Sequence, residues 1–153
     1  MLKIKKNVSV TISLVLAWIA LAGIIIVAGA VPFFGELFIK YMSPVAVKRY
    51  VPGLILLILA LVTVGVADIL LILLLRKVRQ AQVFTPTAVA LLRGISWCCF
   101  VECVILMAKG CLLVMPGIII VAAVAAFLGI VLRVVKNVIE EATAIKSEND
   151  FTI

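Results

Sequence analysis

Four long apolar runs separated by short polar segments dominate the chain, and this pattern predicts four membrane-spanning helices. The runs cover residues 8–31, 53–75, 94–115 and 117–132. A transmembrane helix needs about 20 predominantly apolar residues. The first run has 24 residues without a charge, which is longer than the apolar part of a typical signal peptide. We therefore expect an all-α polytopic membrane protein, a four-helix bundle in one domain over residues 1–153.

The connection over residues 32–52 is the longest between two runs. Its aromatic residues, and Glu36 and Lys40 spaced four apart, predict a short amphipathic helix at the level of the lipid headgroups.

The other connections carry stronger local signals. Thr85 followed by Pro86 has the pattern of a helix N-cap with proline at the first helical position. A helix should therefore begin at Pro86 and continue through Arg93 into the third run. The Met-Pro-Gly sequence at residues 115–117 is the turn signal before the fourth run, so runs three and four should form a tight antiparallel hairpin.

Helical periodicity continues beyond the fourth run, over residues 133–147. Val135, Val138, Ala142 and Ile145 fall on one face of this segment, and charged residues fall on the others. We therefore expect the third and fourth helices to extend beyond the membrane as a pair.

Composition and charge agree with a membrane location. The chain is 67% hydrophobic, well above a soluble domain, and its mean hydropathy is +1.41. The net charge is +7, and the basic residues mostly flank the apolar runs, which places both termini and the central loop in the cytoplasm. The helical pair then projects into the cytoplasm from a multi-pass protein embedded in the lipid bilayer of the plasma membrane. The acidic residues of the cytoplasmic C-terminal segment oppose direct binding to nucleic acid.

The residue types present argue against an enzyme. There is no histidine, which removes imidazole ligands and imidazole acid–base catalysis. The cysteines at positions 98, 99, 103 and 111 lie along one straight helix, so they cannot converge on a metal and are poorly placed for disulfides. We expect them to pack as small apolar residues, with no catalytic residues, no metal site and no cofactor.

Charges inside the runs are the main candidates for chemistry. If the hairpin turns at Pro116, Glu102 faces Ile130 and comes within reach of Arg133. The same count places Arg93 beside Glu140 or Glu141. Two ion pairs should therefore close the hairpin.

Asp68 in the second run and Lys109 in the third are further charges inside the apolar runs. Asp68 and Glu102 each lie about 12–13 Å from the basic residues that flank their runs on the cytoplasmic side. Two carboxylates at one depth could share a proton or bind a cation. Alternatively, Asp68 bonds to a neighbouring helix or pairs with Arg133. Lys109 should reach toward the outer interface.

Three stretches resemble a known family: residues 92–97 (Leu-Arg-Gly-Ile-Ser-Trp), residues 133–142 (Arg-Val-Val-Lys-Asn-Val-Ile-Glu-Glu-Ala) and the tail at residues 145–153. The family comprises bacterial four-helix membrane proteins catalogued as domain of unknown function 2975. Phe151 stands where an aliphatic residue is commoner. The resemblance implies the fold and a bacterial setting but no agreed activity. Similar proteins are often encoded beside a small helix-turn-helix regulator, which implies a cytosolic regulator as partner.

These observations predict a non-catalytic regulatory or partner-binding protein that acts through its cytoplasmic helices. A partner would dock on the tail, formed by Glu148, Asn149, Asp150, Phe151 and Ile153; the alternative is a tail that caps its own bundle. The competing function is a small proton- or cation-coupled transporter, or an antimicrobial-resistance or immunity protein, that uses Asp68 and Glu102. Assembly into a homo-oligomer is open in both cases.

Overall fold

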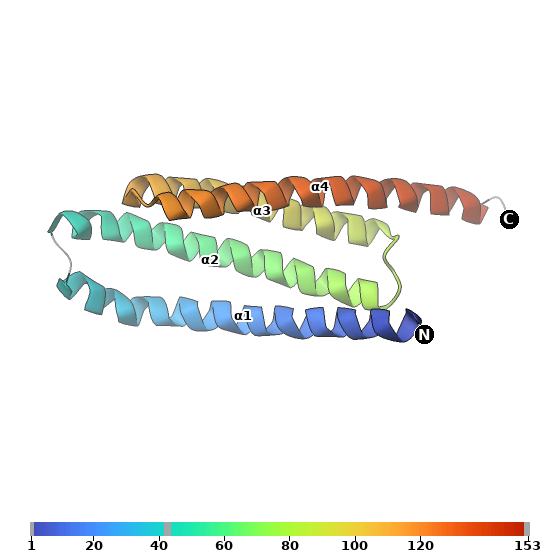
Figure 1. Cartoon of the computed structure of the whole chain (residues 1–153), viewed down its shortest axis with the longest axis horizontal. Helices are drawn as coiled ribbons and strands as arrows, with labels where there is room; N and C mark the ends of the chain where they lie inside the picture. The colour runs from blue at the N-terminus through green and yellow to red at the C-terminus, as the bar shows by residue number, and fades with distance from the viewer. Residues whose placement is uncertain (1, 42–43, 152–153) are drawn as a thin grey trace.

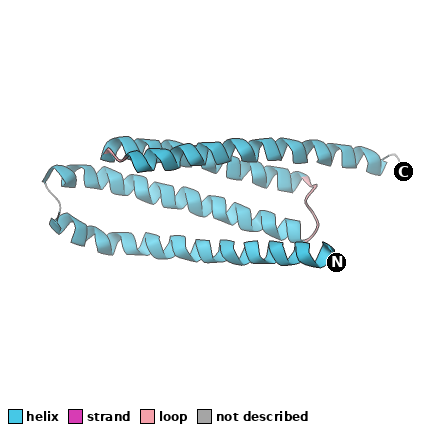
Figure 2. Ribbon diagram, in the orientation of Figure 1, coloured by secondary structure: helices cyan, strands magenta, loops and turns pink. Residues whose placement is uncertain are grey.

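The chain folds into four antiparallel helices in the computed structural model, which describes residues 2–41 and 44–151 (Figure 1). The helices are α1 (Leu2–Tyr41), α2 (Pro44–Arg79), α3 (Pro86–Leu113) and α4 (Pro116–Phe151). Figure 2 shows only helices and loops in this part of the chain. Each helix contains a stretch long and apolar enough to cross a membrane: Val8–Val31, Tyr50–Arg79, Pro86–Leu113 and Pro116–Glu148. The predicted all-α, four-span class is confirmed at this level.

The region between the first two runs differs from the prediction of a separate amphipathic helix, which is wrong. Instead, α1 continues to Tyr41 and α2 already begins at Pro44. Pro52, which ends the predicted connection, lies inside α2. Proline is tolerated within transmembrane helices because neighbouring groups satisfy the freed backbone carbonyl, so it does not mark a boundary here.

The start of α3 follows its local sequence. The side chain of Thr85 accepts a hydrogen bond from the backbone N–H of Ala88 over 3.4 Å, and Pro86 occupies the first turn. The predicted N-cap is confirmed.

The tight turn between α3 and α4 is also confirmed. Val114 adopts a left-handed conformation, with φ 55°, and the N–H of Met115 donates to the carbonyl of Gly110 over 3.1 Å. This left-handed cap ends α3, and α4 begins at Pro116 directly afterwards.

The four helices form an open row and not the closed bundle expected from the sequence. In the described residues, α1 packs on α2, α2 on α3, and α3 on α4, while α1 and α4 have no helix–helix interface with each other. Few side chains are therefore buried, and none of the large ones is fully buried among the described residues. The remaining apolar faces are available to lipid.

The closest packing is between α3 and α4, where small residues meet larger ones. Ala122 is fully buried. A β-carbon placed on Gly129 would lie 3.2 Å from the ring of Phe100, and one on Gly110 would lie 2.8 Å from Cγ1 of Ile119. Small residues allow helix backbones to approach closely in a membrane, so these positions fix the register of the hairpin.

Candidate functional site

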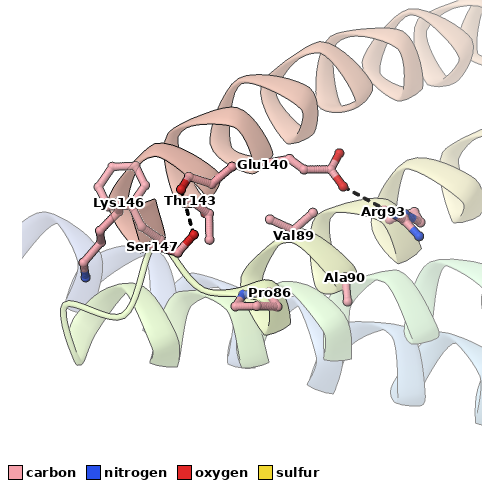
Figure 3. Close-up of a pocket in the computed structure, with 10 residues that line it drawn as sticks. Pro86, Val89, Ala90, Arg93, Glu140, Thr143, Lys146 and Ser147 are labelled. Carbon is pink, nitrogen blue, oxygen red and sulfur yellow. Dashed lines mark hydrogen bonds and ion pairs between the residues drawn. The ribbon is translucent and has the colours of Figure 1, made fainter. Parts of the chain in front are cut away.

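A cleft lies between the first turns of α3 and the last turns of α4, at the end of the molecule where α1 begins and α4 ends (Figure 3). Its volume is about 570 Å³. The lining residues come from both helices and the loop before α3: Phe84, Pro86, Val89, Ala90, Arg93, Glu140, Thr143, Ala144, Lys146 and Ser147. The two helical segments predicted to lie together thus form one concave surface.

The inside of the cleft is mainly apolar. Val89 is buried at its base, and Phe84 is half exposed beside it. The hydroxyl of Thr143 donates to the carbonyl of Ile139, and that of Ser147 donates to the carbonyl of Ala144, both over 2.7 Å. Because these hydroxyl protons already bond to their own helix, the cleft offers chiefly apolar contacts to a ligand.

Two charged side chains of the cleft, Arg93 and Glu140, form a small network with Lys136, whereas Lys146 lines the opposite end of the cleft (Figure 3). Nη2 of Arg93 lies 3.5 Å from Oε1 of Glu140, so the predicted ion pair is confirmed, with Glu140 as the partner. Nζ of Lys136 lies 2.6 Å from Oε2 of the same carboxylate. Lys136 is not among the residues predicted to form ion pairs, although its i,i+4 spacing to Glu140 is a signal for such a pair.

This network contributes little to the stability of the fold. The side chains of Arg93 and Glu140 are 56% and 49% exposed, and exposed ion pairs contribute about 0–1 kcal/mol. Glu141, the alternative partner of Arg93, is exposed and makes no ion pair within the described part of the chain. Arg93 and Glu140 therefore give the cleft a paired positive and negative charge beside its apolar lining.

The predicted ion pair between Glu102 and Arg133 is wrong. The guanidinium of Arg133 instead lies over the ring of Trp97, 5.0 Å from its centroid, and 5.8 Å from that of Phe100. The reason is the register of the hairpin. Gly110 packs against Ile119, and Gly129 against Phe100, which centres the hairpin nearer residue 114 than residue 116. Glu102 therefore faces the region of Ala126, about 10 Å along the axis from Arg133.

Asp68 and Glu102 do not lie at one depth, contrary to the prediction. Leu70 packs against Gly94, and Leu113 against Gly53, so Asp68 is level with the region of Trp97 on α3. Glu102 is about five residues farther along α3, or about 7 Å.

The two carboxylates also lie on different helices. Asp68 lies on the same face of α2 as Leu61 and Gly65, and both of those residues lie against α1. Glu102 lies on α3. Oδ2 of Asp68 and Oε2 of Glu102 are both buried without a hydrogen-bond partner. The two groups are therefore separate features and do not form a shared site.

The remaining polar candidates stay apart from one another. Lys109 is partly buried on α3 and forms no ion pair within the described residues. The four cysteines are free thiols, and no group of three potential ligands for a metal occurs in the described residues.

The predicted partner-binding tail falls mostly outside the described residues. This applies to Ile153 and to the side chains of Asn149, Asp150 and Phe151; Glu148 is exposed on α4. Its role in docking stays a prediction.

Comparison with known proteins supplies a family. Residues 38–153 match the family described as "Protein of unknown function (DUF2975)". No curated protein and no solved structure matches the chain. The match includes α2, α3 and α4 in full, and with them every residue of the cleft. Since it covers well over half of the sequence, the chain belongs to the DUF2975 family.

Proposed function

We propose that this protein is a non-catalytic regulatory membrane protein that binds a soluble protein in the cleft between α3 and α4. The observation that carries the proposal is the apolar, charge-edged cleft of about 570 Å³ between these helices. A surface with an apolar centre and a polar rim is typical of protein recognition sites.

The location of the cleft follows from the distribution of basic residues. Arg76, Lys77 and Arg79 end α2, and Arg93 lies near the start of α3. Under the positive-inside rule, this end faces the cytoplasm of a bacterial cell, with α3 and α4 extending beyond the membrane surface. The partner is then a cytosolic protein.

The shape of the cleft favours an amphipathic helix as the bound element. Its α3 wall runs from Pro86 to Arg93, which is about 10 Å, or two helical turns. A helix with apolar residues at i, i+3 or i+4, and i+7 fits such a groove. The cleft is lined by two basic side chains, Arg93 and Lys146, and by one carboxylate, that of Glu140. This excess of positive charge favours an acidic residue on the bound helix. A small helix-turn-helix regulator, as the family resemblance implies, offers helices of this kind.

Site-specific photocrosslinking in native membranes tests the proposal. A photoreactive residue at Ala90, which is exposed in the cleft, should form an adduct with a soluble protein. The same residue at Ile145, which is 55% exposed on α4 but does not line the cleft, is the matched control and should not. Ala144→Trp, which fills the cleft from α4, should remove the adduct. Adducts that contain only copies of this chain would contradict the proposal and indicate a homo-oligomer.

A second candidate function, ion-coupled transport or an associated resistance or immunity function, is favoured by one observation. The buried oxygens of Asp68 and Glu102 have no hydrogen-bond partner. An unpaired carboxylate in an apolar environment costs several kcal/mol, and binding a proton or a cation removes that cost. Intramembrane carboxylates often mark such pathways.

Flux measurements on reconstituted protein test this second function. If it holds, proteoliposomes should show proton- or cation-driven flux that Glu102→Gln and Asp68→Asn each reduce at least tenfold, because each substitution removes a titratable group while keeping its size. Ala144→Trp, which blocks only the cleft, should leave the flux unchanged. Flux that persists in both carboxylate variants would exclude these groups as the coupling site.

A further inference from the structure

Arg133 is held in an unusual way for a basic residue at the end of an apolar run. Its guanidinium lies over Trp97 and Phe100, 5.0 and 5.8 Å from the two ring centroids. The two rings contact each other edge to face, with centroids 6.2 Å apart. Contact with the ring faces attracts the cation, so α3 fixes the position of this group on α4.

No other described residue forms a hydrogen bond with the guanidinium of Arg133. Within the described residues it forms no ion pair, and the carboxylate of Glu140, about two turns farther along α4, is already shared by Arg93 and Lys136. A guanidinium carries five N–H donors in a planar fork that matches the oxygens of a phosphate. Arg133 is exposed, so these donors are accessible from outside the protein.

A second arginine–tryptophan pair indicates where this group lies relative to the membrane. The guanidinium of Arg76 lies 5.7 Å from the ring centroid of Trp18. Ile24 packs against Gly65, and Leu70 against Gly94. These two contacts place Trp18 within about four residues of the level of Trp97, or about 6 Å.

The two tryptophans are the only ones in the chain, and they are 46% and 54% exposed. These two tryptophans lie within about one helical turn of each other along the axis, and tryptophans are enriched at the interface between membrane and water. Arg133, directly after the fourth apolar run, therefore lies at the edge of the membrane, where its long side chain reaches the lipid headgroups.

The charge around Arg133 favours an anion as the ligand. Arg93 and Lys136 are basic neighbours beyond it, and they share only one carboxylate. We propose that Arg133, positioned by Trp97 and Phe100, binds the phosphate group of an anionic phospholipid at this face of the membrane. The site is separate from the cleft, because Arg133, Trp97 and Phe100 do not line the cleft.

Quenching of Trp97 fluorescence by lipid tests this site directly. The full chain with Trp18→Phe, which leaves Trp97 as the only tryptophan, is reconstituted in phosphatidylcholine vesicles. Dibrominated phosphatidylglycerol or dibrominated phosphatidylcholine is then added at equal mole fraction. The anionic lipid should associate with the site about fivefold more strongly, the order expected for one basic group at an anionic surface. Equal quenching by the two lipids would overturn the proposal.

Variants of Arg133 separate a fixed site from general surface charge. Arg133→Gln should abolish the preference, whereas Arg79→Gln, an exposed arginine in the last turn of α2, should retain it. Arg133→Lys keeps the charge but loses the planar fork, so it should weaken the preference without removing it. An unchanged preference in Arg133→Gln, or a full one in Arg133→Lys, would contradict the proposed site.

Inorganic phosphate distinguishes a lipid from a soluble ligand. Phosphate added to the same vesicles should change the lipid preference no more than chloride does at equal ionic strength. If phosphate alone abolishes the preference, the site binds a soluble phosphate and the assignment to lipid is wrong.

Discussion

At the residue scale, the α3–α4 interface depends on a few atoms in close contact. The hydroxyl of Ser96, which is buried, donates a hydrogen bond to the carbonyl of Gly129 over 2.8 Å. The same glycine leaves room for the ring of Phe100. In an apolar medium there is no hydrophobic force between helices, so close packing and such hydrogen bonds supply the association energy.

Gly110 is the position where an added side chain should do the most damage. A β-carbon there would lie 2.8 Å from the side chain of Ile119 and 3.4 Å from its backbone nitrogen, whereas one at Gly117 would meet nothing within 4 Å. We expect Gly110→Leu to lower the free energy of unfolding by about 1–3 kcal/mol through overpacking. Gly117→Leu, the control, should change it by less than about 0.5 kcal/mol. Denaturation in detergent followed by circular dichroism measures both values, and equal effects would show that the helices do not approach closely at Gly110.

At the element scale, the start of α3 positions one wall of the cleft. Thr85 caps the helix through its side chain and its backbone carbonyl, which accepts from the N–H groups of Ala88 and Val89 over 3.0 and 3.2 Å. The side chain of Val89 then lies between α3 and α4 (Figure 3), and Ala90 also lines the cleft. The order of this wall therefore depends on the cap.

Removing the cap should loosen the wall without unfolding the protein. Thr85→Ala is expected to cost about 1 kcal/mol of local stability, and the amides of residues 88–93 should exchange with deuterium about fivefold faster. Thr87→Ala, at an exposed position in the same turn, is the control and should leave their exchange unchanged. Hydrogen exchange measured by mass spectrometry on the reconstituted protein resolves this segment. Unchanged rates in Thr85→Ala would show that tertiary contacts, and not the cap, order the wall.

At the scale of the whole molecule, the open row of helices decides which charges can meet. Over residues 2–41 and 44–151, each helix contacts only its neighbours along the chain, so Asp68 on α2 does not meet Arg133 on α4. Glu102 and Arg133 are on adjacent helices, but they are separated by the register of the hairpin. The charges inside the apolar runs are consequently dispersed. The cleft, in contrast, brings together two segments that are distant in the sequence, the start of α3 and the end of α4.

Local sequence patterns predicted the features that depend on neighbouring residues. The length of the apolar runs specified four spans, because a helix that crosses lipid must satisfy its own backbone and cover its length with apolar side chains. The Thr-Pro pair specified the start of α3, and the Met-Pro-Gly sequence specified the turn before α4. From that turn, counting residues was sufficient to pair Arg93 with Glu140, because both are exposed and their long side chains tolerate an error of a few residues.

Only the tertiary structure decided the features that depend on register and helix order. The left-handed cap at Val114 and the close approach at Gly110 and Gly129 shift the hairpin by a few residues. That shift takes Arg133 from a carboxylate to the rings of Trp97 and Phe100. The open row likewise separates Asp68 from Glu102. A periodic apolar pattern defines which residues can face a neighbour but not which neighbour is present, since lipid and protein satisfy an apolar face equally well.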